Sequence, residues 1–118
     1  MNVTEFVNAI RMAVENTAVN GQLKSYRAPP GRKPSEDLVE LSNWYKSLTK
    51  ADQEMLGKAM RDAVGASIFG FLCVLDGVRV IENSLERGEL ELWYVKDGNR
   101  TLINDPSENL LHDEYNAV

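Results

Sequence analysis

The residues best suited to acid-base or metal chemistry stand together near the end of the chain. His112, the only histidine, is followed directly by Asp113 and Glu114. A histidine oriented by a carboxylate can move protons or ligate a metal ion. However, neighbouring residues on a helix do not face each other, and His112 with Asp76 or Asp105 lacks a ligand spacing such as H-x-x-x-H. We therefore predict no catalytic residues, no metal and no cofactor.

Cys73 is the only cysteine and lies inside the uncharged run 63–75. Its apolar neighbours disfavour the thiolate, and one cysteine can form neither an intrachain disulfide nor a zinc site built from cysteines. The sequence also has no G-x-S-x-G, no P-loop and no G-x-G-x-x-G for phosphates. Because no motif indicates a reaction, the sequence favours a protein that is not an enzyme.

The positive charge of the chain is concentrated in one segment. Residues 22–35 contain three of the four prolines, four bases and no acid. We predict that they form an irregular, Pro-rich basic connector, which is longer than the usual connection of about 4 to 6 residues. The simplest interpretation is a solvated loop. The alternative is a small anionic-ligand-binding or enzymatic domain that holds an anion near Trp44 or Tyr45 with three of these bases: Arg27, Arg32 and Lys33.

The negative charge lies towards the other end. The 118 residues carry a net charge of −5, and residues 76–118 alone contain ten acids and four bases. Such a surface attracts basic proteins and speeds their association, although many charge runs are only solvated faces. The overall charge argues against nucleic-acid binding. The residues that we expect to contact a partner lie on and around one predicted hairpin: Glu89, Glu91, Trp93 and Asp97.

The secondary-structure elements that carry these charged segments should pack around the apolar run 63–75. Apolar residues recur at three- and four-residue steps over 50–75, which predicts a helix that begins after Thr49 and ends at Asp76-Gly77. A buried strand over 68–75 fits the same run, so that alternative stays open. We expect the last two turns of the helix to be enclosed on all sides. Asp76 should be capped by backbone N–H groups or paired with Arg79 or another base.

Two further helices are predicted upstream. A helix over about 4–20 should be capped at Val3-Thr4 and should end near Asn20-Gly21, where glycine tolerates the left-handed conformation. A helix over 36–48 should begin after Ser35. Its neighbours Trp44 and Tyr45 point about 100° apart, so at most one of them can lie deep in the core. The apolar stripe of the first helix comprises Phe6, Val7, Ile10 and Val14.

The C-terminal part predicts a β-hairpin. β-prone residues over about 90–96 and 100–104 flank Asp97-Gly98, a strong short-range hairpin signal. Its leucine face should pack on the end of the long helix, because an isolated hairpin is marginal in water. A short terminal helix should follow Asp105-Pro106, with a loose tail over 116–118. The expected fold is therefore α+β and mainly α, with three main helices, a hairpin and a short terminal helix in a single domain, 1–118.

The composition, 43% hydrophobic and 26% charged, is typical of a small acidic globular protein. The 13 uncharged residues of 63–75 are fewer than the roughly 20 that a membrane-spanning helix needs, and the first ten residues lack the pattern of a signal peptide. We therefore expect a cytoplasmic, non-catalytic protein-binding domain that engages a basic protein through its acidic hairpin. An inhibitor or immunity-type protein fits by analogy of size and charge only. A homo-oligomer that pairs hairpins through Trp93 is the third hypothesis.

Overall fold

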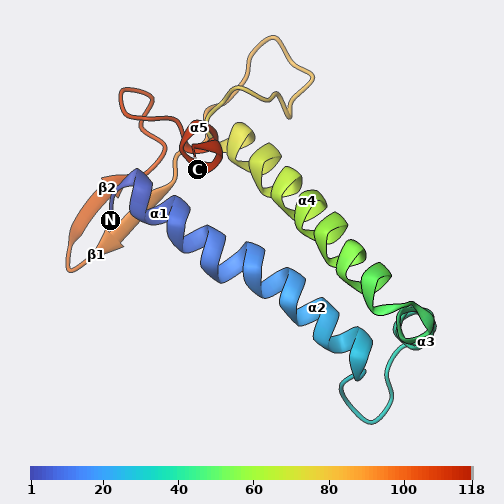
Figure 1. Cartoon of the computed structure of the whole chain (residues 1–118). Coiled ribbons are helices and arrows are strands. Elements are labelled where there is room, and N and C mark those ends of the chain that lie inside the picture. The colour runs from blue at the N-terminus through green and yellow to red at the C-terminus, as the bar shows by residue number, and fades with distance from the viewer. Residues whose placement is uncertain (118) are drawn as a thin grey trace. The chain divides into compact units, whose positions relative to one another are not determined.

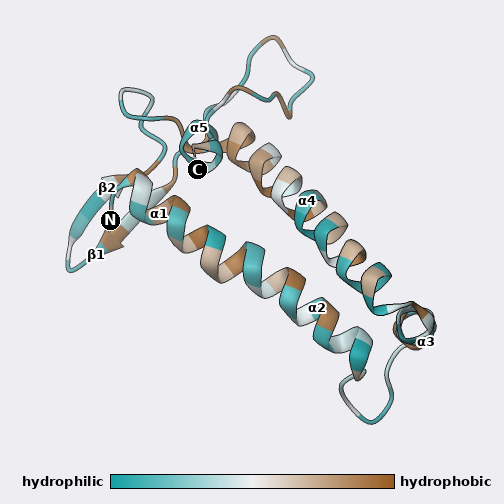
Figure 2. Cartoon of the chain, viewed as in Figure 1, coloured by the Kyte–Doolittle hydropathy of each residue, from teal (hydrophilic) through white to brown (hydrophobic). Residues whose placement is uncertain are grey.

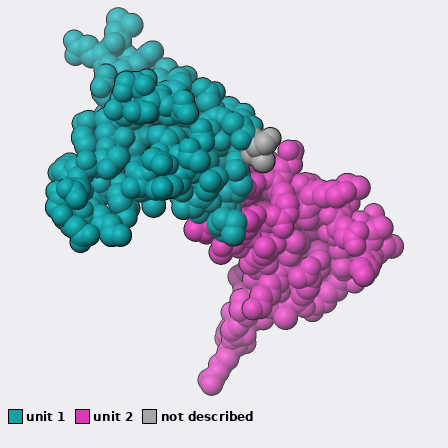
Figure 3. Space-filling view, turned by 60° about the vertical axis from the view of Figure 1, so that its left-hand side comes forward, with its two compact units in different colours: residues 1–12, 66–118 teal, residues 13–65 magenta. Residues whose placement is uncertain are grey.

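The computed structural model describes residues 1–117, which form the predicted α-rich α+β fold (Figure 1). The chain divides into two compact units, coloured in Figure 3: unit 1 comprises Met1–Met12 with Ala66–Val118, and unit 2 comprises Ala13–Gly65. Each unit contains buried side chains of its own. No helix within residues 1–117 has the length and apolarity needed to cross a membrane.

The first helical segment is longer than predicted. Helix α1 (Val3–Ile10) passes into a π-helical stretch, η1 (Arg11–Asn16), and then into α2 (Thr17–Arg27). The predicted end at Asn20-Gly21 is wrong, because the backbone stays helical through Gly21. The irregular connector consequently covers 28–35 rather than 22–35.

The start of α1 is set by Asn2 rather than by Thr4. Oδ1 of Asn2 accepts a hydrogen bond from the Glu5 N–H at 2.9 Å, and the Asn2 N–H donates to the Glu5 carboxylate at 3.2 Å. The two bonds form a capping box. Further along, Val14 is 43% exposed, although it was expected on the apolar stripe. It lies in η1, where the wider i→i+5 turn changes the direction of each side chain.

Helices α3 (Glu36–Ser47) and α4 (Lys50–Leu75) match the predicted ones. Oγ of Ser35 accepts from the Leu38 N–H at 3.2 Å, so Ser35 is the N-cap of α3. Oγ1 of Thr49 likewise accepts from the Asp52 N–H at 3.1 Å at the start of α4. Because α4 remains helical to its end, the alternative strand over 68–75 is excluded.

The last turns of α4 are apolar, as Figure 2 shows in brown, but they are not enclosed on all sides. Leu72 and Cys73 are buried, whereas Phe71 is 62% exposed, so the prediction of a fully enclosed end is wrong. Consecutive helix residues point about 100° apart, and the core covers one side of these turns. Gly77 then ends the helix with a φ of +76°, a conformation that favours glycine.

Strands β1 (Trp93–Lys96) and β2 (Asn99–Leu102) form the predicted hairpin, although both are shorter than the expected 90–96 and 100–104. They are antiparallel, and the pairs run from Trp93 with Leu102 to Lys96 with Asn99. Asp97 and Gly98 make the two-residue turn with φ of +52° and +78°. Two positive φ values are typical of a type I′ turn, which matches the twist of the strands.

The core of unit 1 is made by α1, the end of α4, the residues after β2, and α5 (Leu111–Asn116). From the hairpin side, Leu92 and Tyr94 pack against this core, whereas Leu90 is 48% exposed. Of the tail expected over 116–118, Asn116 is the last residue of α5 and residue 118 lies outside the described residues. The buried members of this core are Val7, Leu72, Ile103, Leu111 and Tyr115.

In unit 2, α2 packs against α3. The rings of Tyr26 and Tyr45 lie 6.0 Å apart, and Oγ of Ser42 donates to the Tyr26 carbonyl at 2.6 Å. Tyr45 is 2% exposed and Trp44 is 49% exposed. This confirms that only one of the two adjacent aromatic side chains lies deep in the core. The amide of Gln53 donates to the Tyr45 carbonyl at 3.0 Å and thereby ties α4 to α3.

Candidate functional site

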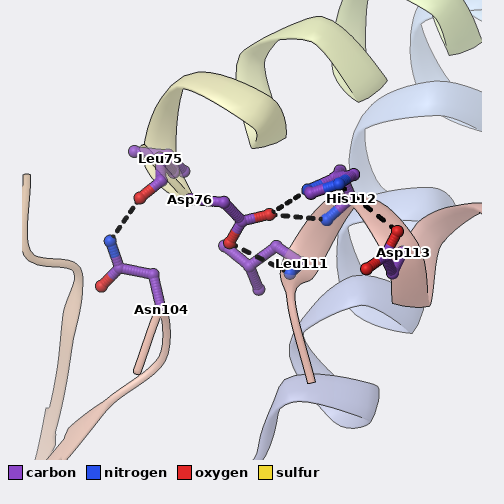
Figure 4. Close-up of polar contacts among 6 residues, drawn as sticks. All are labelled: Leu75, Asp76, Asn104, Leu111, His112 and Asp113. Carbon is purple, nitrogen blue, oxygen red and sulfur yellow. Dashed lines mark hydrogen bonds and ion pairs between the residues drawn. The ribbon is translucent and has the colours of Figure 1, made fainter. Parts of the chain in front are cut away.

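The carboxylate of Asp76 joins the end of α4 to the start of α5 (Figure 4). Its side chain is 1% exposed. Oδ1 accepts a hydrogen bond from the Leu111 N–H at 3.1 Å, and Oδ2 accepts one from the His112 N–H at 2.9 Å. The N-cap residue of α5, Leu110, forms no side-chain cap of its own. Asp76 therefore caps α5 from a distant part of the chain, and the predicted capping by backbone N–H groups is confirmed.

The imidazole ring of His112 lies between two carboxylates. Nδ1 is 2.6 Å from Oδ2 of Asp76, and Nε2 is 3.3 Å from Oδ1 of Asp113. The ring also meets Phe69 edge-on, with centroids 5.7 Å apart. The sequence did not predict that Asp113 orients His112, because adjacent helix residues do not face each other, but the two side chains meet despite their adjacent backbone positions. The ring can donate to both carboxylates at once only in its doubly protonated form.

This geometry is suited to joining α4 and α5. A general base needs a nitrogen that can reach the proton of a substrate, and both nitrogens of His112 already face carboxylates. Within residues 1–117, no group of three or more His, Cys, Asp or Glu side chains is placed to hold a metal ion. We therefore interpret the Asp76–His112 pair as a structural connection between helices.

Asn104 is a second buried polar residue that fixes the candidate binding region. Its Nδ2 donates to the carbonyls of Leu75 at 2.6 Å and Leu90 at 2.7 Å, and its Oδ1 accepts from the Leu92 N–H at 2.8 Å. The Ile103 N–H also donates to the Leu92 carbonyl at 2.8 Å. These bonds continue the hairpin beyond its regular strands and attach it to the end of α4. Sequence reasoning missed Asn104, since nothing in its local pattern separates it from an ordinary loop asparagine.

The segment 77–91 connects α4 to the hairpin without regular secondary structure, and every residue in it is exposed. It is the long loop that follows α4 in Figure 1. Its tip is nevertheless held by internal hydrogen bonds, because the Glu82 carboxylate accepts from the Gly88 N–H at 2.9 Å and Arg87 donates to the Ser84 carbonyl at 3.0 Å. Leu85, inside this closed tip, is fully exposed. A connection of this length without regular structure is often functional.

The residues predicted to contact a protein partner all belong to unit 1. Glu89 and Glu91 lie in the irregular segment just before β1, Trp93 begins β1, and Asp97 lies in the hairpin turn. All four are exposed. The guanidinium of Arg100 lies 5.0 Å from the centre of the Trp93 ring, so a cation covers part of this aromatic face. The three carboxylates therefore come from two places, the segment before β1 and the hairpin turn.

The residues predicted to bind an anion are separated in the structure. Arg27 is the last residue of α2, whereas Arg32 and Lys33 lie in the connector 28–35. Arg27 and Tyr45 line the same hollow in unit 2, while Arg32, Lys33 and Trp44 do not line it. Only part of the predicted anion site is brought together.

The hollow in unit 2 has a volume of about 670 Å³. One face of α4 supplies most of its wall, because its lining residues recur at helical spacing from Lys50 to Arg61, and α2 and α3 supply the rest. Sequence reasoning missed the bases of α4, since a lysine or arginine in a polar helix segment usually marks only a solvated face. The lining residues are Leu23, Arg27, Tyr45, Lys50, Gln53, Glu54, Gly57, Lys58 and Arg61.

Comparison of the chain with protein-family models, with curated proteins and with solved structures finds no match.

Proposed function

We propose that this chain is a non-catalytic, cytoplasmic protein-binding domain that engages a basic protein partner through the acidic surface of unit 1. An inhibitor or immunity-type protein is the functional class that this proposal favours. The observation that carries it is the charge of unit 1, which contains eleven acids and five bases, against seven acids and eight bases in unit 2. A charge imbalance of this kind steers a basic partner towards one part of the molecule.

The acidic surface also offers apolar contacts, which a stable interface needs. Interfaces combine a few apolar anchors with a polar rim. Leu85 is fully exposed in the held tip of the segment 77–91, Trp93 is 39% exposed, and Val95 is 58% exposed. Since Asn104 attaches the hairpin to α4, these side chains stand on a supported framework. Less conformational entropy is then lost on binding than for a disordered segment.

The test is affinity capture from a native lysate with a charge-neutralised variant. The triple variant Glu89→Gln, Glu91→Gln and Asp97→Asn removes three carboxylates, and asparagine suits the positive φ of position 97. The matched control, Glu36→Gln, Glu40→Gln and Asp62→Asn, removes three exposed carboxylates from unit 2. Both variants have the same net charge, so they differ only in where the charge is lost.

We expect the wild type and the control to retain a stoichiometric basic protein, and the triple variant to lose it. Binding of the purified pair should also weaken as the salt concentration rises, because exposed charges more than about 8 to 10 Å apart are screened at physiological ionic strength. Failure to recover any stoichiometric partner would contradict the proposal. Equal loss of the partner by the triple variant and by the control would show that only net charge matters, which contradicts it too.

A further inference from the structure

We propose that the hollow of unit 2 is a binding site for a small organic phosphate, independent of the acidic surface of unit 1. Four of its lining side chains are cationic and one is anionic. The cations come from two helices: Arg27 from the end of α2, and Lys50, Lys58 and Arg61 from α4. Four cations around one concave surface leave an excess of positive charge that suits a ligand with more than one negative charge.

The positive charge of the hollow is not neutralised by the protein. Among residues 1–117, no carboxylate forms an ion pair with any of its four cations, and Glu54, the only acid in the lining, forms none either. Like charges gathered on one surface repel each other and destabilise the fold. A bound anion would remove this repulsion. An anionic ligand could therefore bind these four exposed cations without breaking an existing ion pair.

Arg61 is positioned by hydrogen bonds that leave its positive charge unpaired with a carboxylate. Its Nη2 donates to Oδ1 of Asn20 at 2.9 Å, and its Nη1 contacts Oδ1 of Asn16 at 3.3 Å. Both partners are neutral side-chain amides. The guanidinium group has five N–H donors in a planar fork, so donors remain for the oxygens of a phosphate. Ordering the arginine before a ligand arrives lowers the entropic cost of binding.

The lining of the hollow also has an uncharged part. Leu23 and Gly57 both line it, and a Cβ built at Gly57 would lie in ordinary contact with Leu23, 3.6 Å from its Cδ1. A larger side chain at position 57 would extend into the hollow. The volume of about 670 Å³ lies within the range of roughly 300 to 1,000 Å³ that is typical of small-molecule sites. We infer a ligand with a phosphate on the cationic rim and an apolar or aromatic body against Leu23.

In the test, the full chain is titrated with phenyl phosphate, ADP and inorganic phosphate. Binding is measured by calorimetry and by changes in amide chemical shifts. The double variant Arg27→Gln with Lys58→Gln removes two cations of the hollow. Its matched control, Arg32→Gln with Lys33→Gln, removes the same charge from the connector outside the hollow. Gly57→Leu tests the volume directly, and it should not harm α4 because leucine favours helix more than glycine does.

We expect phenyl phosphate or ADP to bind more tightly than inorganic phosphate and to shift the amides of Gln53 and Gly57. Because the double variant loses two charged donors for the phosphate, its affinity should fall at least about tenfold, while that of the control should change less than about twofold. Gly57→Leu should abolish binding. No binding of any probe to the wild type, equal losses in both double variants, or unchanged binding in Gly57→Leu would overturn the proposal.

These outcomes are separate from those of the protein-capture experiment. Every variant used here lies in unit 2, whereas the triple variant that tests the acidic surface lies in unit 1. Loss of phosphate binding with retained protein capture, or the reverse, therefore identifies which of the two proposals fails.

Discussion

Asp76 and His112 lie 36 positions apart in the chain and share a hydrogen bond of 2.6 Å between Oδ2 and Nδ1. The same carboxylate caps the first two N–H groups of α5. One buried side chain thus satisfies three donors, and it joins the two helices that carry much of the core of unit 1.

The substitution Asp76→Ala should destabilise unit 1 by about 3 kcal/mol, since it leaves the imidazole and two backbone N–H groups without their acceptor. Urea unfolding in a Trp44→Phe background measures this loss, because Trp93 then reports from unit 1 alone. Asp113→Asn is the control. Asp113 is 70% exposed, and exposed ion pairs contribute roughly 0 to 1 kcal/mol. Similar losses in the two variants would refute the structural role of Asp76.

Asn104→Ala should loosen the attachment of the hairpin to α4. The substitution removes three hydrogen bonds and leaves the Leu92 N–H and two carbonyls without their partner. Each buried polar group left unsatisfied costs about 1 to 3 kcal/mol. We expect faster hydrogen exchange at the Leu92 amide and a lower free energy of unfolding for unit 1. Asn109→Ala, at an exposed position, should leave both quantities unchanged, and exchange at Leu92 that is equally slow in Asn104→Ala would contradict this role.

The sequence predicted those elements whose signals are local. The bounds of α4 followed from Thr49, the apolar spacing and Asp76-Gly77, and the hairpin turn followed from Asp97-Gly98. The continuation of α2 through Gly21 could not be predicted in the same way. Asn20-Gly21 is an ordinary stop signal, but here Asn20 accepts a hydrogen bond from Arg61 of α4 and the helix continues past it.

The candidate sites were less predictable than the fold. Exposure of Glu89, Glu91, Trp93 and Asp97 was expected from their pattern, whereas the hollow of unit 2 joins Arg27 to bases more than 20 positions away in the sequence. Asn104 and Asp76 act through partners that lie 12 to 36 positions distant. Contacts over such separations depend on packing, and no local pattern reports them.

The stability of the fold should depend on pH through the Asp105 carboxyl, and this dependence can be measured directly. Hydrogen bonds from the Ser107 N–H at 2.9 Å and from its Oγ at 2.7 Å favour the ionised form and lower the pKa of the Asp105 carboxyl below its ordinary value of 3.8. A carboxyl whose pKa is lower in the folded than in the unfolded chain stabilises the fold above the unfolded value. That contribution is lost as the pH falls below 3.8 and through the folded pKa.

An NMR titration of the Asp105 carboxyl carbon should therefore show a midpoint below 3.8. In Ser107→Ala the midpoint should rise only part of the way, because the backbone N–H still donates when the hydroxyl is gone. Ser84→Ala serves as the control, since Ser84 lies in the segment 77–91 and does not contact Asp105. A midpoint that is the same in wild type and Ser107→Ala would show that the hydroxyl bond does not form in solution.

Substitution of Gly21 or Gly98 by alanine should change the stability of the fold in opposite directions. Gly21 lies inside α2, and nothing in the structure lies within 4 Å of a Cβ built there. Gly21→Ala should therefore stabilise unit 2 by about 1 kcal/mol through its higher helix propensity. Gly98 has a φ of +78°, a left-handed conformation that costs other residues about 1 to 2 kcal/mol, so Gly98→Ala should destabilise unit 1.

Thermal and urea unfolding of the two variants measure both changes in stability. The experiment also decides between two descriptions of the first helical segment. If that segment ended at Gly21 in a left-handed conformation, as its sequence suggests, alanine there would be destabilising for the same reason as at Gly98. A gain in stability at position 21 together with a loss at position 98 is expected only if the helix continues to Arg27 and the hairpin turn requires its glycine.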